Sequence, residues 1–423
     1  MIGAGPSGLA VAKNFAVADV AFDCFERNDD VGGNWYFGKP ASSVYASTHL
    51  ISSKRLTEFV DFPMPIDYPA YPHHRQAWEY LRSYARHFGL YPRITFNTSV
   101  ERVEPEGDRW QVQLSTGESR RFDGVVIANG HNWSPRYPQL KGSFGGVSLH
   151  SCQYKTPDVL SGKRVLVVGA GNSGCDIAVE SAQHAAATFH SIRRGYHYLP
   201  KFISGRPADE YGELMLRLRV PLWLRRLITR YIARLTLGPP QRIGLPKPDH
   251  RFWESHPIVN SQLLYYVGHG RIQVKPDITE LRGDRVVFAD GSQEQIDVII
   301  YATGFEIRFP FIDQQHLNWC DGRPDLYLNI FHPQHDRLLF AGLIQPDSGQ
   351  WGLVDVQAQL ITKYLVALDR SDPAAEQLKT RMHASDGLAK IRYVRSPRHL
   401  LEVEHFSYRK TLKKRLAQFA HSA

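Results

Sequence analysis

Two glycine patterns of the form G-x-G-x-x-G constrain the fold of this 423-residue chain more than any other feature. The first pattern is made by Gly3, Gly5 and Gly8, and the second by Gly169, Gly171 and Gly174. In such a turn the first glycine allows a tight bend, the second lets the backbone approach a pyrophosphate, and the third lets the following helix lie close to the strand. Two copies at strand-to-helix junctions predict two dinucleotide-binding units.

The residue that ends the strand after each turn indicates which nucleotide the unit binds. After the first turn, the apolar segment 20–26 ends at Glu26. A carboxylate there accepts hydrogen bonds from ribose hydroxyls and repels a 2′-phosphate, which favours the adenosine of FAD. After the second turn, the segment 188–192 is followed by Arg193 and Arg194. Guanidinium groups pair with a 2′-phosphate, which favours NADPH.

The two arginines also begin a strongly basic segment. Residues 191–251 contain 13 Lys and Arg and 4 Asp and Glu, a difference of +9. This equals the net charge of the whole chain, +9. The charge of the protein is therefore concentrated in one segment and does not describe a basic surface as a whole. A solvated basic face is the alternative interpretation of Arg193 and Arg194.

The composition is that of a soluble globular protein, with 43% hydrophobic and 22% charged residues. The four cysteines lie far apart and form no C-x-x-C motif, which argues against a thiol-disulfide site or a zinc ribbon. We therefore expect no metal, and a reducing, cytoplasmic location. No run of about eighteen apolar residues occurs, so no transmembrane helix is expected.

A third motif lies just before the second glycine turn. Residues 144–154 read FGGVSLHSCQY, which has the form F-x-G-x-x-x-H-x-x-x-Y. With this motif the chain resembles the class B flavin-containing monooxygenases and matches their fingerprint in full. The resemblance continues in residues 24–35 (CFERNDDVGGNW) and 301–305 (YATGF), and it covers about nine-tenths of the chain.

The resemblance implies an α/β fold with two Rossmann-like, three-layer dinucleotide-binding domains. The FAD-binding domain is discontinuous and comprises residues 1–157 and 297–423. The NADP-binding domain comprises residues 158–296 and carries a basic helical insertion at about 200–250. Only two residues precede Gly3, so we expect the first strand to be truncated at the N-terminus, because such a strand needs about five residues.

The same motifs imply the residues that bind the cofactors FAD and NADPH. The residues expected around FAD are Gly3, Gly5, Gly8, Glu26, Trp35 and Gln357. Those expected around NADP are Gly169, Gly171, Gly174, Arg193 and Arg194. Further cofactor-binding residues are Gly33, Asn172, Ser173, Thr303 and Gly304, together with His150 and Tyr154 of the fingerprint, which help to position NADP. Without the surrounding motifs, His150 and Tyr154 would be interpreted as a loop histidine and a packed tyrosine.

The chemistry implied by the resemblance is monooxygenation. NADPH reduces FAD, the reduced flavin takes up O2 as a C4a-hydroperoxide, and a nucleophilic nitrogen or sulfur atom of a small substrate receives one oxygen atom. Tyr154-Lys155 stands where the Baeyer–Villiger relatives have Trp followed by Pro or Asp, which favours the N/S-oxygenating branch. A Baeyer–Villiger activity on the same scaffold remains an alternative.

One departure from the family concerns Ile51. Family members usually carry an asparagine three residues before the lysine of their S-S-K segment, and here that position is Ile51. Isoleucine cannot donate a hydrogen bond, so an NADPH oxidase that releases peroxide is a second alternative. A third is a non-catalytic protein that binds nucleotides or docks on a membrane and does not retain flavin. No catalytic residue is assigned.

The insertion contains a predicted basic amphipathic helix. Its apolar positions are Leu224, Leu227, Ile228, Tyr231, Ile232 and Leu235, and Arg226, Arg230 and Arg234 follow a neighbouring face. Residues 212–237 are interpreted as a peripheral contact with an anionic membrane, as a lid over the substrate tunnel, or as a helix packed on its domain with a solvated arginine face. Nucleic-acid binding is not expected, because few aromatic residues accompany the arginines. The sequence indicates neither the substrate nor the oligomeric state.

Overall fold

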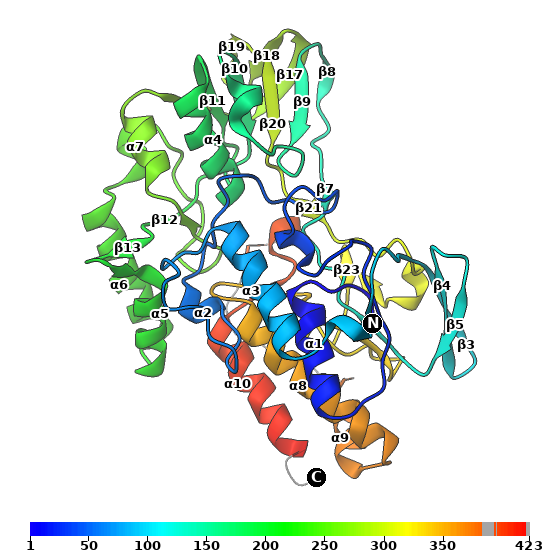
Figure 1. The fold of residues 1–423 in the computed structure, drawn as a ribbon. Coiled ribbons are helices and arrows are strands. Elements are labelled where there is room, and N and C mark those ends of the chain that lie inside the picture. The colour runs from blue at the N-terminus through cyan, green and yellow to red at the C-terminus, as the bar shows by residue number, and fades with distance from the viewer. Residues whose placement is uncertain (383–392, 395, 420–423) are drawn as a thin grey trace.

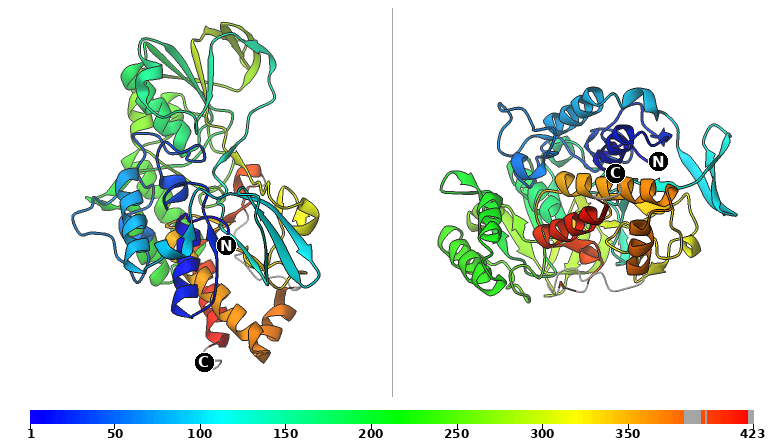
Figure 2. Two further views of the ribbon diagram at one scale, coloured as in Figure 1. Left: turned by 45° about the vertical axis from the view of Figure 1, so that its right-hand side comes forward. Right: turned by 90° about the horizontal axis from the view of Figure 1, so that it is seen from below.

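The computed structural model describes residues 1–382, 393–394 and 396–419, and it has the mixed α/β architecture expected from the sequence (Figure 1). The upper lobe in Figure 1 is built around strands from the middle of the chain. The lower lobe combines helices from the N-terminal part with helices that precede the C-terminus (Figures 1 and 2). Segments far apart in the sequence therefore lie side by side in the lower lobe.

A short parallel sheet forms the centre of the lower lobe. Strand β1 (Cys24–Phe25) pairs with β2 (Ile94–Thr95), and β6 (Val125–Ile127) pairs with β24 (Leu338–Phe340). Ile2 bridges Phe25 on one side and Ile127 on the other, so it joins the two pairs. The residue before the first glycine turn thus occupies the middle of the sheet. The strand predicted at residues 20–26 is paired only at its end.

Helices cover this sheet. They are α1 (Pro6–Val17), α3 (His74–His87), α8 (Trp351–Asp369), α9 (Pro373–Met382) and α10 (His405–Leu416). Helices α1 and α8 pack against each other, and Leu9, Val354 and Ile361 are fully buried in their shared core. The sequence pattern predicts helices over 9–17, 76–87, 355–368 and 408–420. In the structure α1, α3, α8 and α10 each begin earlier than these ranges. Ala420 lies outside the described residues.

A small antiparallel sheet flanks the lower lobe. It consists of β3 (Val100–Glu106), β4 (Arg109–Leu114) and β5 (Ser119–Phe122). Its inward residues, among them Val103 and Trp110, are buried in a core with Phe340 of β24. The alternating buried and exposed residues of β4 are those of a strand with one solvated face.

A five-stranded parallel sheet forms the upper lobe. Its spatial order is β16 (Ile272–Lys275), β11 (Ala187–Ser191), β10 (Arg164–Val168), β20 (Val298–Tyr301) and β9 (Val147–His150). The apolar residues 165–168 predict a strand and residues 175–187 a helix. The strand is β10, and the helix is α4 (Asn172–His184), which ends three residues before 187 because β11 begins there.

The apolar run of β10 is buried on both faces. Val165 and Val167 pack with Ile177 of α4, whereas Leu166 packs with Phe288 on the opposite side. Phe288 belongs to a second sheet, formed by β19 (Gln293–Gln295), β18 (Arg285–Phe288), β17 (Ile278–Gly283) and β8 (Lys141–Phe144). Continuous apolar strands are typical of a sheet enclosed between two layers.

The five-stranded sheet extends beyond the residue range 158–296. Strand β9 precedes this range and β20 follows it, yet both are parallel neighbours within the sheet. Burial explains the pairing, because all four residues of β20 are buried and the strand needs partners on both edges. The chain therefore enters and leaves the upper lobe through β9 and β20.

Several short pairings lie between the main sheets. They are β12 (Tyr198–Leu199) with β15 (Ile258–Val259), β7 (Ser134–Pro135) with β21 (Phe305–Glu306), and β25 (Gln345–Pro346) with β26 (Glu402–Val403). Helix α7 (Gln262–Gly268) packs against α4. None of the helices in the described part of the chain is long and apolar enough to cross a membrane.

The insertion forms two helices, α5 (Ala208–Arg217) and α6 (Leu222–Thr236). The predicted apolar face of α6 is divided in the structure. Ile228 and Ile232 are half-buried, whereas Leu227, Tyr231 and Leu235 are 54%, 65% and 68% exposed. The packed face of the helix instead contains the small residues Thr229 and Ala233. Of the three interpretations of this segment, that of a helix packed on its domain therefore fits only three of the six apolar residues.

Candidate active site

The first glycine turn is closely packed at two of its three glycines. Gly3 has a φ of +99°, and a Cβ there would lie 2.9 Å from the carbonyl oxygen of Ala128. A Cβ on Gly8 would lie 1.9 Å from the carbonyl oxygen of Gly3. Gly5 and Gly33 face each other, since a Cβ on Gly33 would lie 2.9 Å from the Gly5 Cα. Only backbone therefore fits at this point, as a pyrophosphate site requires.

Glu26 links the end of β1 to this turn. Its Oε2 accepts a hydrogen bond from the Ala4 N–H at 2.8 Å, and its Oε1 accepts bonds from the backbone N–H and side-chain amide of Asn28, both at 2.9 Å. Glu26 is buried, and three N–H donors hold the carboxylate in place. Carboxylate oxygens accept more than one hydrogen bond each, so capacity remains for ribose hydroxyls.

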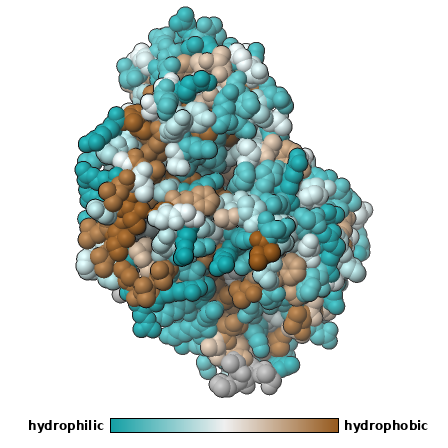
Figure 3. Space-filling view, turned by 60° about the vertical axis from the view of Figure 1, so that its left-hand side comes forward, coloured by the Kyte–Doolittle hydropathy of each residue, from teal (hydrophilic) through white to brown (hydrophobic). Residues whose placement is uncertain are grey.

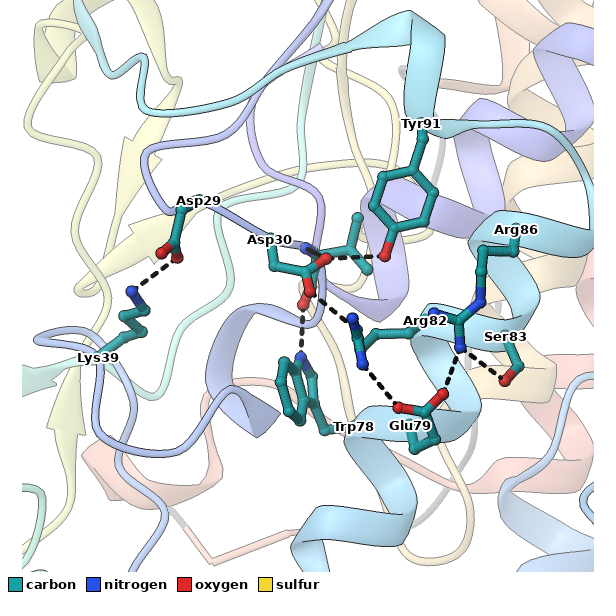
Figure 4. A network of polar contacts seen from close by, with 10 residues as sticks. Asp29, Asp30, Lys39, Trp78, Glu79, Arg82, Ser83, Arg86 and Tyr91 are labelled. Carbon is teal, nitrogen blue, oxygen red and sulfur yellow. Dashed lines mark hydrogen bonds and ion pairs between the residues drawn. The ribbon is translucent and has the colours of Figure 1, made fainter.

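A polar network positions the loop that carries Gly33 and Trp35 (Figure 4). Asp30 accepts hydrogen bonds from Arg82 and Tyr91, both at 2.8 Å, and Arg82 also pairs with Glu79 at 2.9 Å. The indole of Trp78 donates to the Val31 carbonyl at 2.9 Å. These contacts fasten the loop to α3. Trp35 is half-buried, and its ring meets Trp351 of α8 edge to face at 5.8 Å.

Gln357 lies inside α8 and is fully buried. Its Oε1 accepts a hydrogen bond from the Gly342 N–H at 2.9 Å, and its Nε2 donates to the Tyr408 hydroxyl at 2.6 Å. Gly342 in turn approaches the first glycine turn, because a Cβ there would lie 2.0 Å from the Ser7 Oγ. Gln357 therefore supports the turn through Gly342.

The second glycine turn repeats the geometry of the first. Gly169 has a φ of +107°, and a Cβ on Gly174 would lie 1.9 Å from the Gly169 carbonyl oxygen. Asn172 begins α4 and accepts a hydrogen bond from the Val259 N–H at 3.1 Å, while Ser173 is exposed. The first N–H groups of α4 point out of the helix beside Gly171, as in anion sites at helix N-termini.

The two predicted arginines differ in their surroundings. Arg194 forms an ion pair with Asp249, with 2.7 Å between Nε and Oδ1. Arg193 is exposed and makes no ion pair with any residue of the described chain. Its guanidinium is therefore the one of the two that is available to an added phosphate. The sequence did not predict the partner of Arg194, which lies 55 residues away.

The fingerprint residues His150 and Tyr154 are buried near the junction of the lobes. The Nε2 of His150 lies 3.1 Å from the Gly304 carbonyl oxygen, and its Nδ1 lies 3.2 Å from the Cys152 Sγ. Burial lowers the pKa of His150 to about 4. Tyr154 donates its hydroxyl hydrogen to Glu180 of α4 at 2.7 Å. A neutral histidine with these contacts orients the backbone and does not transfer protons near neutral pH.

The turn after β20 joins the lobes through Thr303 and Gly304. The Thr303 carbonyl accepts a hydrogen bond from the Arg136 guanidinium at 3.0 Å, and the Gly304 carbonyl accepts one from the Arg136 N–H at 3.1 Å. A Cβ on Gly169 would lie 2.5 Å from the Ala302 carbonyl oxygen, so this turn lies against the second glycine turn. The sequence motifs did not include Arg136, which carries no local signal.

A cavity lies beneath the insertion and encloses about 1090 Å³, part of it open to solvent. Ile51 and Ser52 form one wall, and residues of α5 and α6, such as Met215 and Ile232, form another. Asp209 at the start of α5 accepts a hydrogen bond from the Ser53 N–H at 2.6 Å, which connects the insertion to the loop that carries Ile51. The lining is mainly apolar, as in most small-molecule sites.

The polar residues of the cavity include two carboxyl groups with perturbed pKa values. Burial raises the pKa of Asp209, and burial together with the nearby Glu404 raises the pKa of Asp347 to about 7. Burial lowers the pKa of His256 and His405 to about 4. These residues come from four separate segments, so no spacing in the sequence could have predicted the cavity.

The flavin-binding monooxygenase-like family model matches residues 1–418. Flavin-containing monooxygenase 5 of Oryctolagus cuniculus is 34% identical over 432 residues, and the match covers 96% of this chain and 80% of the relative. Dimethylaniline monooxygenase (N-oxide-forming) 2 of the same species is also 34% identical, and that match covers 87% of this chain and 73% of the relative.

Solved structures share the fold at lower sequence identity. S-allyl-L-cysteine S-oxygenase from Allium sativum superposes with a TM-score of 0.67 at 22% identity, over 98% of this chain and 87% of that one. Cyclohexanone monooxygenase in its open form has a TM-score of 0.72 at 20% identity, over 98% of this chain and 96% of that one. A cyclohexanone monooxygenase from Rhodococcus sp. Phi1, bound to NADP⁺, also has a TM-score of 0.72 at 19% identity, over 98% of this chain and 96% of that one.

Proposed function

Because the chain belongs to the flavin-binding monooxygenase-like family and is an FAD-dependent monooxygenase with NADPH as its reductant, we propose that it oxygenates a nucleophilic nitrogen or sulfur atom of a small substrate. The observation that carries this proposal is the apolar cavity beside Ile51, which adjoins the junction of the two lobes. An enclosed apolar site excludes water from a reactive oxygen species. The bound flavin supplies the hydride-accepting and oxygen-activating chemistry.

The residues of the first glycine turn fit FAD. Gly3, Gly5 and Gly8 leave room only for backbone, and Glu26 offers carboxylate oxygens to ribose hydroxyls. The domain that binds FAD then comprises residues 1–157 and 297–423, apart from β9 and β20, which pair in the upper sheet. We assign NADPH to the second glycine turn in the upper lobe, with Arg193 at the 2′-phosphate.

The cavity suits a molecule with an apolar body and a basic group. Three carboxyl groups, those of Asp209, Glu213 and Asp347, line it together with one guanidinium, that of Arg225. Glu213 pairs with Arg217, and the raised pKa values of Asp209 and Asp347 favour their protonated forms, so the lining carries little net charge and favours neutral ligands or amines over anions. Amines and amine-bearing thioethers meet this requirement. The N-oxide-forming and S-oxygenating activities named for two relatives belong to the same classes of chemistry.

A direct test follows NADPH, O2 and product together. The purified holoenzyme is supplied with NADPH and, in separate reactions, with N,N-dimethylaniline, methyl phenyl sulfide or cyclohexanone. We expect N-oxide and sulfoxide to form in proportion to the NADPH consumed, and no lactone. Lactone as the main product would replace the proposal by Baeyer–Villiger oxygenation, the reaction class of the cyclohexanone monooxygenases that share this fold.

A second candidate function is an NADPH oxidase. Ile51 favours it, because its side chain is 40% exposed on the cavity wall and offers no hydrogen-bond donor to a reactive oxygen species. In the same experiment, release of one hydrogen peroxide for each NADPH with every substrate would support this function. Formation of N-oxide or sulfoxide would exclude it.

We also propose a peripheral contact between the insertion and an anionic membrane. Leu214, Leu218, Trp223, Leu227, Tyr231 and Leu235 of the two helices and their connection are more than half exposed. Arg217, Arg219, Arg230 and Arg234 are exposed on the same segments. Figure 3 shows hydrophobic residues gathered on the side of the molecule where α5 and α6 lie. Exposed aromatic and aliphatic residues flanked by arginines suit the boundary between lipid headgroups and acyl chains.

Vesicle sedimentation tests this contact. We expect the protein to sediment with vesicles of phosphatidylcholine and phosphatidylglycerol and less with phosphatidylcholine alone. Trp223→Ala should weaken the binding, whereas Tyr265→Ala, at a similarly exposed aromatic residue of α7, should not. Equal binding by both variants would contradict a contact through this segment.

A further inference from the structure

Arg398 lies beside the second glycine turn although it belongs to the C-terminal part of the chain. A Cβ on Gly171 would lie 3.9 Å from the carbon and one terminal nitrogen of its guanidinium. Arg398 is part of the short 3₁₀ helix Pro397–His399. Its guanidinium also stands over the ring of Tyr196, 4.7 Å from the ring centre. The stacking fixes the plane of a side chain that would otherwise be mobile.

The segment around Arg398 is fastened to the upper lobe and then returns to the lower one. The Nε2 of His399 lies 2.8 Å from the Ser255 hydroxyl, and the Val394 N–H donates to the Glu254 carbonyl at 2.8 Å. A few residues later the chain pairs with β25 through β26, close to Asp347 at the cavity. The hydrogen bonds of Val394 and His399 thus hold Arg398 beside Gly171. The chain that follows Arg398 continues into the wall of the cavity.

Glu402 acts electrostatically on the guanidinium of Arg398 without forming an ion pair with it. The guanidinium forms no ion pair within 4.0 Å with any residue of the described chain, whereas Arg194 and Arg226 pair with Asp249 and Glu254. The Arg398 guanidinium faces the first N–H groups of α4, which carry partial positive charge. Two positive features that face the same space need an anion between them, and the glycine at position 171 keeps that space free.

We infer that Arg398 binds the pyrophosphate of NADPH. This inference rests on the proposed assignment of NADPH to the second glycine turn. It adds a residue from outside the NADP-binding segment, so that the C-terminal segment and the upper lobe hold the nucleotide together. Arg194 is given no phosphate because its Nε pairs with Asp249, which balances its charge.

A purely structural role for Arg398 makes different predictions. Its positive charge opposes the burial that raises the pKa of Glu402 to about 8, so the arginine also balances a buried carboxyl group. If this were its only role, replacement of Arg398 would lower the melting temperature and leave nucleotide affinity unchanged. Nucleotide binding by the oxidised holoenzyme therefore separates the two roles without any need for turnover.

The experiment is titration calorimetry of the FAD-loaded protein with NADP⁺ and with NAD⁺. Arg398→Ala should lower the affinity for both nucleotides by the same factor, on the order of 10- to 100-fold, because both contain the pyrophosphate. Arg193→Ala should lower the affinity for NADP⁺ by a similar factor and leave the affinity for NAD⁺ unchanged. Arg194→Ala is the matched control and should change neither by more than about twofold.

Arg398→Lys covers the case in which the alanine variant does not fold. It keeps the charge but loses the planar group that stacks on Tyr196, and we expect a smaller, equal loss of affinity for both nucleotides. Unchanged affinity in Arg398→Ala, or a loss confined to NADP⁺, would overturn the inference. Failure of the unmodified holoenzyme to bind either nucleotide would instead refute the assignment of NADPH to this turn.

Discussion

Tyr154 and Glu180 form the most direct link between the fingerprint and α4. The Tyr154 hydroxyl lies 2.7 Å from the Glu180 Oε2, and the Ser47 hydroxyl lies 3.0 Å from the same oxygen. Beside them, the Tyr45 hydroxyl lies 3.3 Å from the Asp176 Oδ2. One side of α4 therefore holds both the residues after β9 and a loop of the lower lobe, so the tyrosine of the fingerprint acts on the relative position of the lobes.

Tyr154→Phe should lower the stability of the protein by about 1 to 2 kcal/mol, because the buried Tyr154 no longer donates a hydrogen bond to the Glu180 carboxylate. We expect a melting temperature a few degrees lower, measured by calorimetry of the holoenzyme. Tyr137→Phe is the control, since its hydroxyl lies 3.2 Å from Gln153 but the side chain is exposed. Equal shifts in the two variants would contradict a specific role for Tyr154.

His150→Gln should change the affinity for NADPH but not the pH profile. Because burial lowers the pKa of His150 to about 4, its imidazole is neutral throughout pH 6 to 8. The NADPH concentration for half-maximal flavin reduction should rise about threefold to tenfold as the bond to Gly304 is disturbed. His184→Gln, on the exposed side of α4, is the control. An ionisation between pH 6 and 8 that disappears only in His150→Gln would refute the neutral histidine.

The positions of turns and strands could be predicted from the sequence because their signals are local. Gly169 is required by a left-handed φ, and Gly174 because a Cβ there would meet the Gly169 carbonyl; the two positions are five residues apart. The apolar run 165–168 predicted a buried strand in the same way. Local spacing could not predict that β20 lies beside this strand and that β9 lies beside β20.

Long-range pairings account for what the sequence did not predict. Arg193 and Arg194 are adjacent residues of the same type, so the sequence does not distinguish their roles. In the structure the ion pair with Asp249 distinguishes Arg194 from Arg193. The apolar residues of α6 follow helical spacing, yet the cavity and the solvent divide them between two environments. Such outcomes depend on which distant segment arrives at a site, and residue type and periodicity do not contain that information.

Asp347→Asn should stabilise the protein at neutral pH. Burial and Glu404 raise the pKa of Asp347 from 3.8 to about 7. The folded state therefore holds a proton that the unfolded state has lost, and stability falls as the pH rises from about 4 to 7 and is constant above. Asparagine removes this dependence and still accepts the hydrogen bond that the His405 N–H donates at 2.9 Å.

The stabilisation by Asp347→Asn should be near zero at pH 4 and on the order of 2 to 4 kcal/mol at pH 7 and above. Melting temperatures measured from pH 4 to 8 would show the difference between variant and parent growing with pH. Asp108→Asn, at an exposed carboxyl group, should leave the melting temperature unchanged at every pH. A constant difference for Asp347→Asn would contradict the raised pKa.

Ile51→Asn should reduce the share of NADPH that ends as hydrogen peroxide. Ile51 lines the cavity with an exposed hydrocarbon surface, and an asparagine there adds an amide donor in an apolar setting. A hydrogen bond of ordinary net strength corresponds to a change of about twofold to tenfold in the ratio of product to peroxide. The ratio of peroxide to NADPH, measured with and without a thioether, gives the result.

Ile66→Asn, the same replacement at a side chain that is 97% exposed outside the cavity, should leave the ratio unchanged. An unchanged ratio in Ile51→Asn would mean that position 51 does not control coupling and that other cavity groups, such as Ser52 or Asp209, must be examined for that role.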